Sequence, residues 1–179
     1  MKVTLLVRRR WIVLIVGLAP IILESCGHPS DKQLKADFRT HKQEFQILSQ
    51  MAFAEDRDVI RIAPTSVCCK SGLQFTVSGD HEYGPAVITA SRWRKYRELF
   101  AQAGVDAGIA IAVDHNQVFF FKSTDGGLGA GSIKGYVNSR GSLAPLLDSL
   151  DGIRTSECPS RSCKFYERLD GDWYLFYSM

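Results

Sequence analysis

Few polar residues of this chain could act on a ligand, and three of them are adjacent. Asp80, His81 and Glu82 follow one another, and carboxylates beside an imidazole can hold a metal ion or move a proton. Lys134 could add a positive charge to a pocket near Asp80 and His81. A solvated loop is the commoner explanation of adjacent charged residues. Asp80, His81 and Lys134 are therefore a candidate polar site without a metal-ligand motif.

Four cysteines, Cys68, Cys69, Cys158 and Cys163, are disulfide candidates in an oxidising compartment. A bridge between adjacent cysteines is strained, so we expect Cys68 and Cys69 each to pair elsewhere. Three pairings are possible, and spacing does not choose among them. We expect at least one bridge between the first pair of cysteines and the second, worth about 2–4 kcal/mol. A zinc site of four thiolates is the alternative, although an adjacent pair departs from the usual ligand spacing.

The glycine-rich stretch from Asp125 to Gly135 has the composition of a phosphate-binding loop but not its pattern. It contains no Gly-Lys-Ser or Gly-Lys-Thr, and a strand-like segment rather than a helix follows it. No nucleophile-elbow motif or His-Glu-x-x-His helix occurs in the chain. The sequence therefore predicts no catalytic residue, no metal and no cofactor, and it favours a non-enzymatic role.

The first 25 residues have the pattern of an export signal. Arg8, Arg9 and Arg10 precede an uncharged run from Trp11 to Leu23. As a helix this run would span about 20 Å, which is too short for a bilayer core of about 30 Å. A positive segment followed by a short apolar run is typical of a secretory signal peptide.

The leader ends in Leu23-Glu24-Ser25-Cys26, which resembles the lipobox of bacterial lipoproteins. The resemblance implies that the Cys26 thiol carries a diacylglycerol, that a peptidase cleaves before it, and that residues 26–30 form a tether. Glu24 stands where the pattern has a small or apolar residue. An ordinary signal peptide and an uncleaved anchor are the alternatives. In a Gram-negative host, Gly27 after the cysteine implies sorting to the outer membrane, facing the periplasm.

Without this leader 154 residues remain, Cys26 to Met179, which suits a single domain. The chain is 45% hydrophobic and 23% charged, as globular proteins are, which excludes disorder over most of it. The net charge of +3 lies entirely in the leader, because the remainder carries 18 basic and 18 acidic residues. A neutral domain has no general attraction for nucleic acid. We therefore expect one domain over residues 31–179, a lipid anchor to the membrane, and no nucleic-acid partner.

Hydrophobic periodicity predicts two main helices. A capping box begins an amphipathic helix over about 30–55, in which His41 lies on the apolar stripe as a core or boundary residue. A second helix spans about 91–103 and ends at Gly104. A short helix near Leu143–Leu150 is also predicted.

Strand-like runs account for most of the remaining chain. Asp114–Gln117 and Asp170-Gly171 are hairpin turns between such runs. Short loops between successive strands favour an antiparallel sheet with the two main helices packed on one face, an α+β fold. The predicted strands are 59–62, 73–77, 108–113, 118–121, 131–138, 164–169 and 172–177.

Two apolar runs rich in aromatic residues, Phe119–Phe121 and Trp173–Tyr177, are unusually continuous. A strand that is buried on both faces has this pattern, and so does a strand that pairs with another protein. We expect these runs to belong to the core. An exposed apolar face would instead mark a surface for a partner.

Cys26 in its lipobox, His41–Phe45, Lys134-Gly135-Tyr136 and Gly171–Tyr174 together resemble a family of uncharacterised bacterial lipoproteins. The resemblance implies an address in the cell envelope and a single domain, but no activity. We expect a non-enzymatic lipoprotein that acts by protein contact, as an immunity-type inhibitor or an accessory subunit does. The alternative is an envelope hydrolase or small-ligand-binding lipoprotein that uses the polar residues named above.

Overall fold

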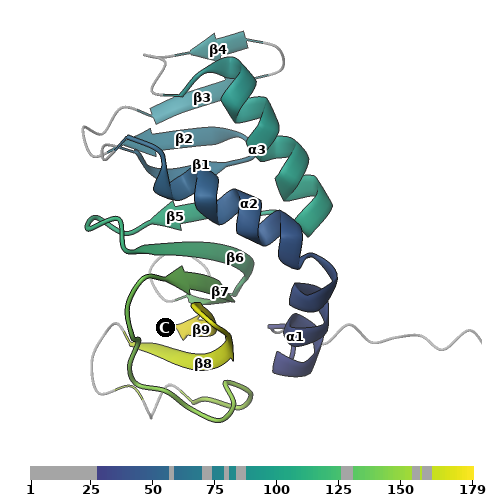
Figure 1. The fold of residues 1–179 in the computed structure, drawn as a ribbon, viewed down its shortest axis with the longest axis vertical. Helices are drawn as coiled ribbons and strands as arrows, with labels where there is room; N and C mark the ends of the chain where they lie inside the picture. The colour runs from purple at the N-terminus through teal and green to yellow at the C-terminus, as the bar shows by residue number, and fades with distance from the viewer. Residues whose placement is uncertain are drawn as a thin grey trace, which may run out of the picture.

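The computed structural model describes residues 28–56, 59–69, 74–78, 81–83, 88–125, 131–154, 158 and 163–179. These residues form three helices and one sheet of nine strands, which confirms the predicted α+β fold (Figure 1). The helices are α1 (Asp31–Thr40), α2 (Lys42–Phe53) and α3 (Ala90–Ala103). The strands are β1 (Val59–Ala63), β2 (Ser66–Cys69), β3 (Gln74–Ser78), β4 (His81–Tyr83), β5 (Ile109–Ile111), β6 (Gln117–Asp125), β7 (Ser132–Ser139), β8 (Lys164–Asp170) and β9 (Trp173–Ser178).

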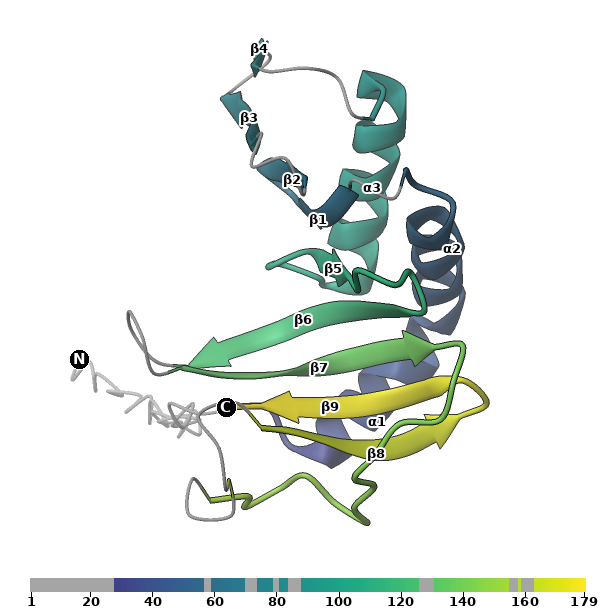
Figure 2. The same cartoon turned by 90° about the vertical axis from the view of Figure 1, so that its left-hand side faces the viewer.

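The sheet has the strand order β4-β3-β2-β1-β5-β6-β7-β9-β8, and every neighbouring pair is antiparallel. Figures 1 and 2 show the three helices on one face of this sheet, with α3 beside the β1–β5 part. The final hairpin turns at Gly171, whose φ of 56° is in the left-handed region that glycine adopts freely. The predicted packing of the helices on a single face is therefore present.

The predicted helix over 30–55 is two helices that meet at His41. The capping box is present, since the Ser30 side chain accepts from the Gln33 N–H and the Gln33 side chain accepts from the Ser30 N–H. His41 has φ −113° and ψ 22°, which is not helical, and it interrupts the chain between α1 and α2. Phe38 and Phe45, on either side of the break, are 3% and 0% exposed, with ring centroids 5.7 Å apart. The break lets both helices bury their aromatic side chains against one sheet.

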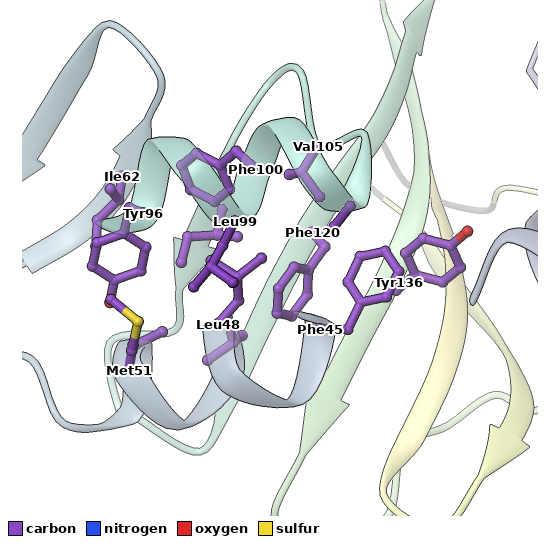
Figure 3. Close-up of a cluster of buried hydrophobic side chains, with 14 of the residues drawn as sticks. Phe45, Leu48, Met51, Ile62, Tyr96, Leu99, Phe100, Val105, Phe120 and Tyr136 are labelled. Carbon is purple, nitrogen blue, oxygen red and sulfur yellow. The ribbon is translucent and has the colours of Figure 1, made fainter. Parts of the chain in front are cut away.

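The main core lies between the helices and the sheet (Figure 3). Figure 3 shows Phe45 and Leu48 of α2 facing Leu99 and Phe100 of α3, with Phe120 and Tyr136 of the sheet close by. The Phe45 and Tyr136 ring centroids are 4.8 Å apart. This packing places α1 and α2 firmly over β6 and β7.

A smaller core lies on the opposite face of the sheet, and the segment after β7 closes part of it. Leu143 packs there, whereas Leu150 belongs to the main core, so this segment crosses from one face to the other around the β8 edge. The Leu147 N–H donates to the Tyr166 carbonyl at 2.8 Å. The members of the smaller core are Phe119, Val137, Leu143, Tyr166, Tyr174 and Phe176.

Three local predictions are wrong. The segment from Leu143 to Leu150 is not a helix, because its backbone bonds to the β8 edge and Pro145 has no N–H to donate. Cys68 and Cys69 lie in β2, a strand that is absent from the predicted set. His81 and Glu82, for which a solvated loop is the commoner expectation, lie in β4.

Among the described residues, no helix is both long enough and apolar enough to span a membrane.

Candidate functional site

A groove with apolar walls lies on the sheet face opposite the helices. Its volume is about 550 Å³, within the usual range for binding clefts. Strand alternation creates it, because Val118 and Phe120 point to the helices while Phe119 and Phe121 point away from them. We call this feature the apolar groove. The described residues that line it are Ala110, Ile111, Ala112, Val113, Gln117, Phe119, Phe121, Ile133, Lys164, Phe176 and Ser178.

The floor of the apolar groove is built from aromatic rings that hold one another in place. The rings of Phe119 and Phe176 meet edge to face with centroids 5.2 Å apart, and those of Phe121 and Phe176 are 6.2 Å apart. Such pairs favour a fixed geometry. Val113, on one wall, is 73% exposed, so this side of the groove is open to solvent.

Two cations lie over the aromatic floor. The Lys164 ammonium is 4.7 Å from the centroid of the Phe119 ring, and the Arg61 guanidinium is 5.6 Å from that of Phe121. These are distances at which a cation is attracted by the face of a ring. No carboxylate is among the described residues that line the groove. The groove therefore combines an apolar floor with a positive rim.

A cluster of buried charges lies on the helix-covered face. Lys134 of β7 is 3% exposed, and its Nζ is 2.8 Å from Asp31 Oδ1 and 2.7 Å from Asp151 Oδ1. The Asp31 N–H, at the start of α1, donates to both oxygens of the Asp151 carboxylate. Asp31 Oδ2 in turn accepts from the Ser149 hydroxyl and the Leu150 N–H, each at 2.6 Å. These bonds offset the cost of burying the charges and join α1 to β7 and the segment after it.

The two most buried carboxylates near this cluster have opposite pKa shifts. Burial alone would raise the pKa of Asp31, but hydrogen bonds from Lys134, Ser149 and the Leu150 N–H outweigh burial and lower it from 3.8 to about 2. Burial raises the pKa of Glu167, and the negative charge of Asp31 raises it further. The ion pair with Lys35 lowers this pKa but does not cancel the rise. Asp31 therefore stays ionised at neutral pH as the partner of Lys134.

His28 holds the chain that precedes α1 against the end of the sheet. Its Nδ1 lies 2.6 Å from the Ser123 Oγ, and its Nε2 lies 2.6 Å from the Ser132 Oγ. The ring also meets Tyr177 edge-on, with centroids 5.4 Å apart. A small hollow of about 190 Å³ lies beside it, and Lys134 and Asp151 are part of its lining. The imidazole thus has a serine hydroxyl at each nitrogen.

The structure does not bring the residues of the predicted polar site together. Lys134 lies in β7 and His81 in β4, and five strands separate these two in the sheet. At a strand spacing of about 4.8 Å this places them roughly 25–30 Å apart. Asp80 lies outside the described residues. Lys134 is instead committed to Asp31 and Asp151.

The predicted bridge between the two pairs of cysteines is wrong. Cys158 and Cys163 are bonded to each other. Cys163 immediately precedes β8, whereas Cys68 and Cys69 lie in β2, and five strands separate β2 from β8. A bridge across a distance of this order is impossible without taking the sheet apart. Cys26 lies outside the described residues.

Sequence reasoning missed the apolar groove and His28. The alternation of side chains along β6 would have placed Phe119 and Phe121 on one face and Phe120 on the other. No sequence signal links His28 to Ser123 and Ser132, which follow it by 95 and 104 residues.

Among the described residues, no group of three or more His, Cys, Asp or Glu side chains is placed to hold a metal ion. Comparison with known proteins gave no match to a family model, to a curated protein or to a solved structure.

Proposed function

We propose that this chain is a non-enzymatic binding module, held at a membrane of the bacterial cell envelope by lipidated Cys26, and that the apolar groove receives a segment of a protein partner. The apolar groove is the single observation that carries the proposal. An apolar surface left open on an otherwise well-packed sheet is typical of an interaction site. The module acts as an immunity-type inhibitor or an accessory subunit does, by contact.

The chemistry of the groove defines the segment that fits it. Its floor of Phe119, Phe121 and Phe176 takes apolar side chains, and Lys164 and Arg61 at the rim favour carboxylates beside them. Neighbouring side chains of an extended segment point to opposite sides, so a segment whose apolar side chains face the floor and whose acidic residues lie at either end of the apolar stretch presents both kinds of side chain to the groove. The partner segment is therefore apolar and acidic.

The tether supports an anchored arrangement. His28 is only two residues after Cys26, and its bonds to Ser123 and Ser132 hold this part of the chain against the end of the sheet. An anchor at Cys26 would consequently hold the domain close to the bilayer, with the ends of β6, β7 and β9 that surround His28 nearest to it.

A peptide titration tests the groove. The full-length protein, purified in detergent, is titrated with a fluorescent peptide that has a central run of leucines and glutamates at both ends. Ala112→Phe fills the groove and is expected to weaken binding at least tenfold, whereas Ala101→Phe, the same change at an exposed site on α3, leaves binding unchanged. Equal binding by both variants would contradict the proposal. Binding of oleate without binding of the peptide would also contradict it and would make the groove a lipid site.

The anchor is tested separately by the intact mass of the protein extracted from membranes. A chain that begins at Cys26 and is heavier by the mass of its acyl groups is expected, and Cys26→Ala should abolish both the added mass and the membrane association. An unlipidated mass for the parent protein would contradict the anchor while leaving the groove untouched.

A second function, envelope hydrolase, rests on His28 and Ser132. A serine hydroxyl 2.6 Å from an imidazole nitrogen is the arrangement of a nucleophile and its base. Ser123 occupies the other nitrogen, where acyl-transfer triads have a carboxylate. Labelling with a fluorophosphonate that is lost in Ser132→Ala and kept in Ala101→Phe would support this function; absence of labelling in the parent protein would exclude a reactive Ser132.

A further inference from the structure

A second hollow, whose lining is mostly charged and not apolar, lies between the helices and the edge strand β8. Its volume is about 460 Å³. Phe38 and Leu169 supply its apolar part, and all of its other described lining residues are charged. We call it the cationic hollow. Its charged residues are Lys35, Arg39, Lys42, Arg168 and Asp170.

Two of the cations are already paired. Lys35 forms an ion pair with Glu167, and Lys42 forms one with Asp170. The hydrogen bond from Lys42, together with its charge, lowers the pKa of Asp170, so this carboxylate remains ionised. The ion pair between Lys42 and Asp170 also joins the start of α2 to the end of β8. The pairs therefore fix the walls of the hollow and leave its net charge positive.

The two arginines supply the unbalanced charge. Neither the Arg39 side chain of α1 nor the Arg168 side chain of β8 has a hydrogen bond or ion pair to any residue that the structure describes. They come from two different elements and line the same hollow. A guanidinium offers a planar fork of donors that matches the oxygens of a phosphate group.

We propose that the cationic hollow binds a phosphate group. Arg39 and Arg168 hold the phosphate oxygens from two sides, and Lys35 and Lys42 add positive charge without leaving their carboxylate partners. Phe38, which is 3% exposed, gives the hollow a rigid base. This site is independent of the apolar groove, since the two share no described lining residue.

The position of the hollow bears on the source of the phosphate. Asp170 pairs with Trp173 at one end of the β8–β9 hairpin, whereas Tyr177, which contacts His28, lies near the other end (Figure 2). Trp173 and Tyr177 are four positions apart along the strand, a distance of about 14 Å. The hollow thus lies at the end of the hairpin away from the tether. With the chain anchored at Cys26, on which this step rests and which is itself proposed, a soluble phosphate ester reaches the hollow more easily than a membrane headgroup does.

Calorimetric titration of the full-length protein with inorganic pyrophosphate tests the proposal. The double variant Arg39→Gln/Arg168→Gln is expected to weaken binding at least tenfold. The control Lys32→Gln/Arg94→Gln removes the same charge from exposed sites outside the hollow and should bind as the parent does. Equal weakening in both variants would overturn the proposal, because it would show only general attraction of an anion.

A second arm distinguishes the sources of the phosphate. The same variants are mixed with vesicles of phosphatidylglycerol and, for comparison, of phosphatidylcholine, and co-sedimentation is measured. Binding to pyrophosphate alone supports a soluble ligand, and loss of phosphatidylglycerol binding in the hollow variant supports a headgroup. Absence of binding to both probes would overturn the site.

Discussion

The two faces of the sheet are built from the same strands but differ in what they bury. The helix-covered face buries charges as well as apolar side chains, and Lys134, Asp31 and Asp151 are paired there. The opposite face has a smaller core of apolar and aromatic residues, and its cations, Lys164 and Arg61, stay at the rim of the groove. One face is closed by three helices; the other is closed only in part, by the segment after β7.

This difference assigns the stability of the domain to one face of the sheet and the binding of a partner to the other. Charges that are buried and paired are costly to disturb, so the helix-covered face is expected to set the stability of the domain. Apolar surface that nothing covers contributes little to stability, and it remains available for a partner. The predictions below test this division, and they begin with the largest effect.

Neighbouring phenylalanines of β6 provide the most direct comparison. Phe120 is fully buried in the main core, so Phe120→Ala is expected to lower the free energy of unfolding by about 3–5 kcal/mol. Phe121 lines the groove and is only half-buried, and Phe121→Ala should cost about 1 kcal/mol. Urea unfolding of the two variants measures both values. Equal losses would mean that the groove is as much a part of the core as the helix-covered face.

Two lysines allow the same comparison for charge. Lys134→Met leaves Asp31 without its ammonium in a buried place and is expected to cost about 3 kcal/mol. Lys164→Met, on the rim, should change the free energy of unfolding by less than about 0.5 kcal/mol. Denaturant midpoints measured at neutral pH give the two values. A small effect of Lys134→Met would show that the buried ion pairs do not join α1 to the sheet.

Local signals account for the parts of the fold that could be predicted. The Asp170-Gly171 turn is encoded in two residues, and the structure has a hairpin there with Gly171 in the left-handed region. The capping box at Ser30 and the helix end at Gly104 are equally local. The break at His41 was missed because an amphipathic stripe continues through it, and only packing against the sheet separates α1 from α2.

The features that could not be predicted depend on residues distant in sequence. Lys134 forms an ion pair with Asp31, 103 positions before it, and no local sequence pattern predicts such a pair. The cysteine pairing failed for a similar reason, since strand order, which places β2 far from β8, follows from the whole sheet. The residues of the cationic hollow come from α1 and the start of α2 and, far from these in sequence, from β8, so no local pattern predicts that their charges lie together.

The acid limb of stability tests the buried carboxylates. The pKa of Asp31 is about 2 in the folded state and 3.8 ordinarily, so its contribution of about 2 kcal/mol is present above pH 3.8 and is lost as the pH falls towards 2. Glu167 has a pKa raised above 4.5 in the folded state, so its protonation favours folding. The free energy of unfolding therefore rises as the pH falls from the folded-state pKa of Glu167 to 4.5, which is the opposite of the effect of Asp31.

Unfolding free energies between pH 2 and 7 separate the two groups. Asp31→Asn should reduce the fall in the free energy of unfolding below pH 4, however much the substitution lowers that free energy at neutral pH. Glu167→Gln should remove the gain in stability that accompanies acidification above pH 4.5. An unchanged acid limb in Asp31→Asn would show that Asp31 is not the carboxylate whose pKa is held low.

The disulfide gives the smallest expected effect, because it spans few residues; its Cys163 directly precedes Lys164, which lines the groove on the partly closed face. The bond from Cys158 to Cys163 joins positions only five apart, so Cys158→Ser/Cys163→Ser should lower the free energy of unfolding by at most about 2 kcal/mol. Cys163 is also held to Met179 by two backbone hydrogen bonds, which keep β8 in place without the bridge. Peptide mapping should find Cys158 linked to Cys163 and neither linked to Cys68 or Cys69. A loss as large as that of Phe120→Ala would show that the partly closed face also sets the stability of the domain, and the division between the two faces would then be wrong.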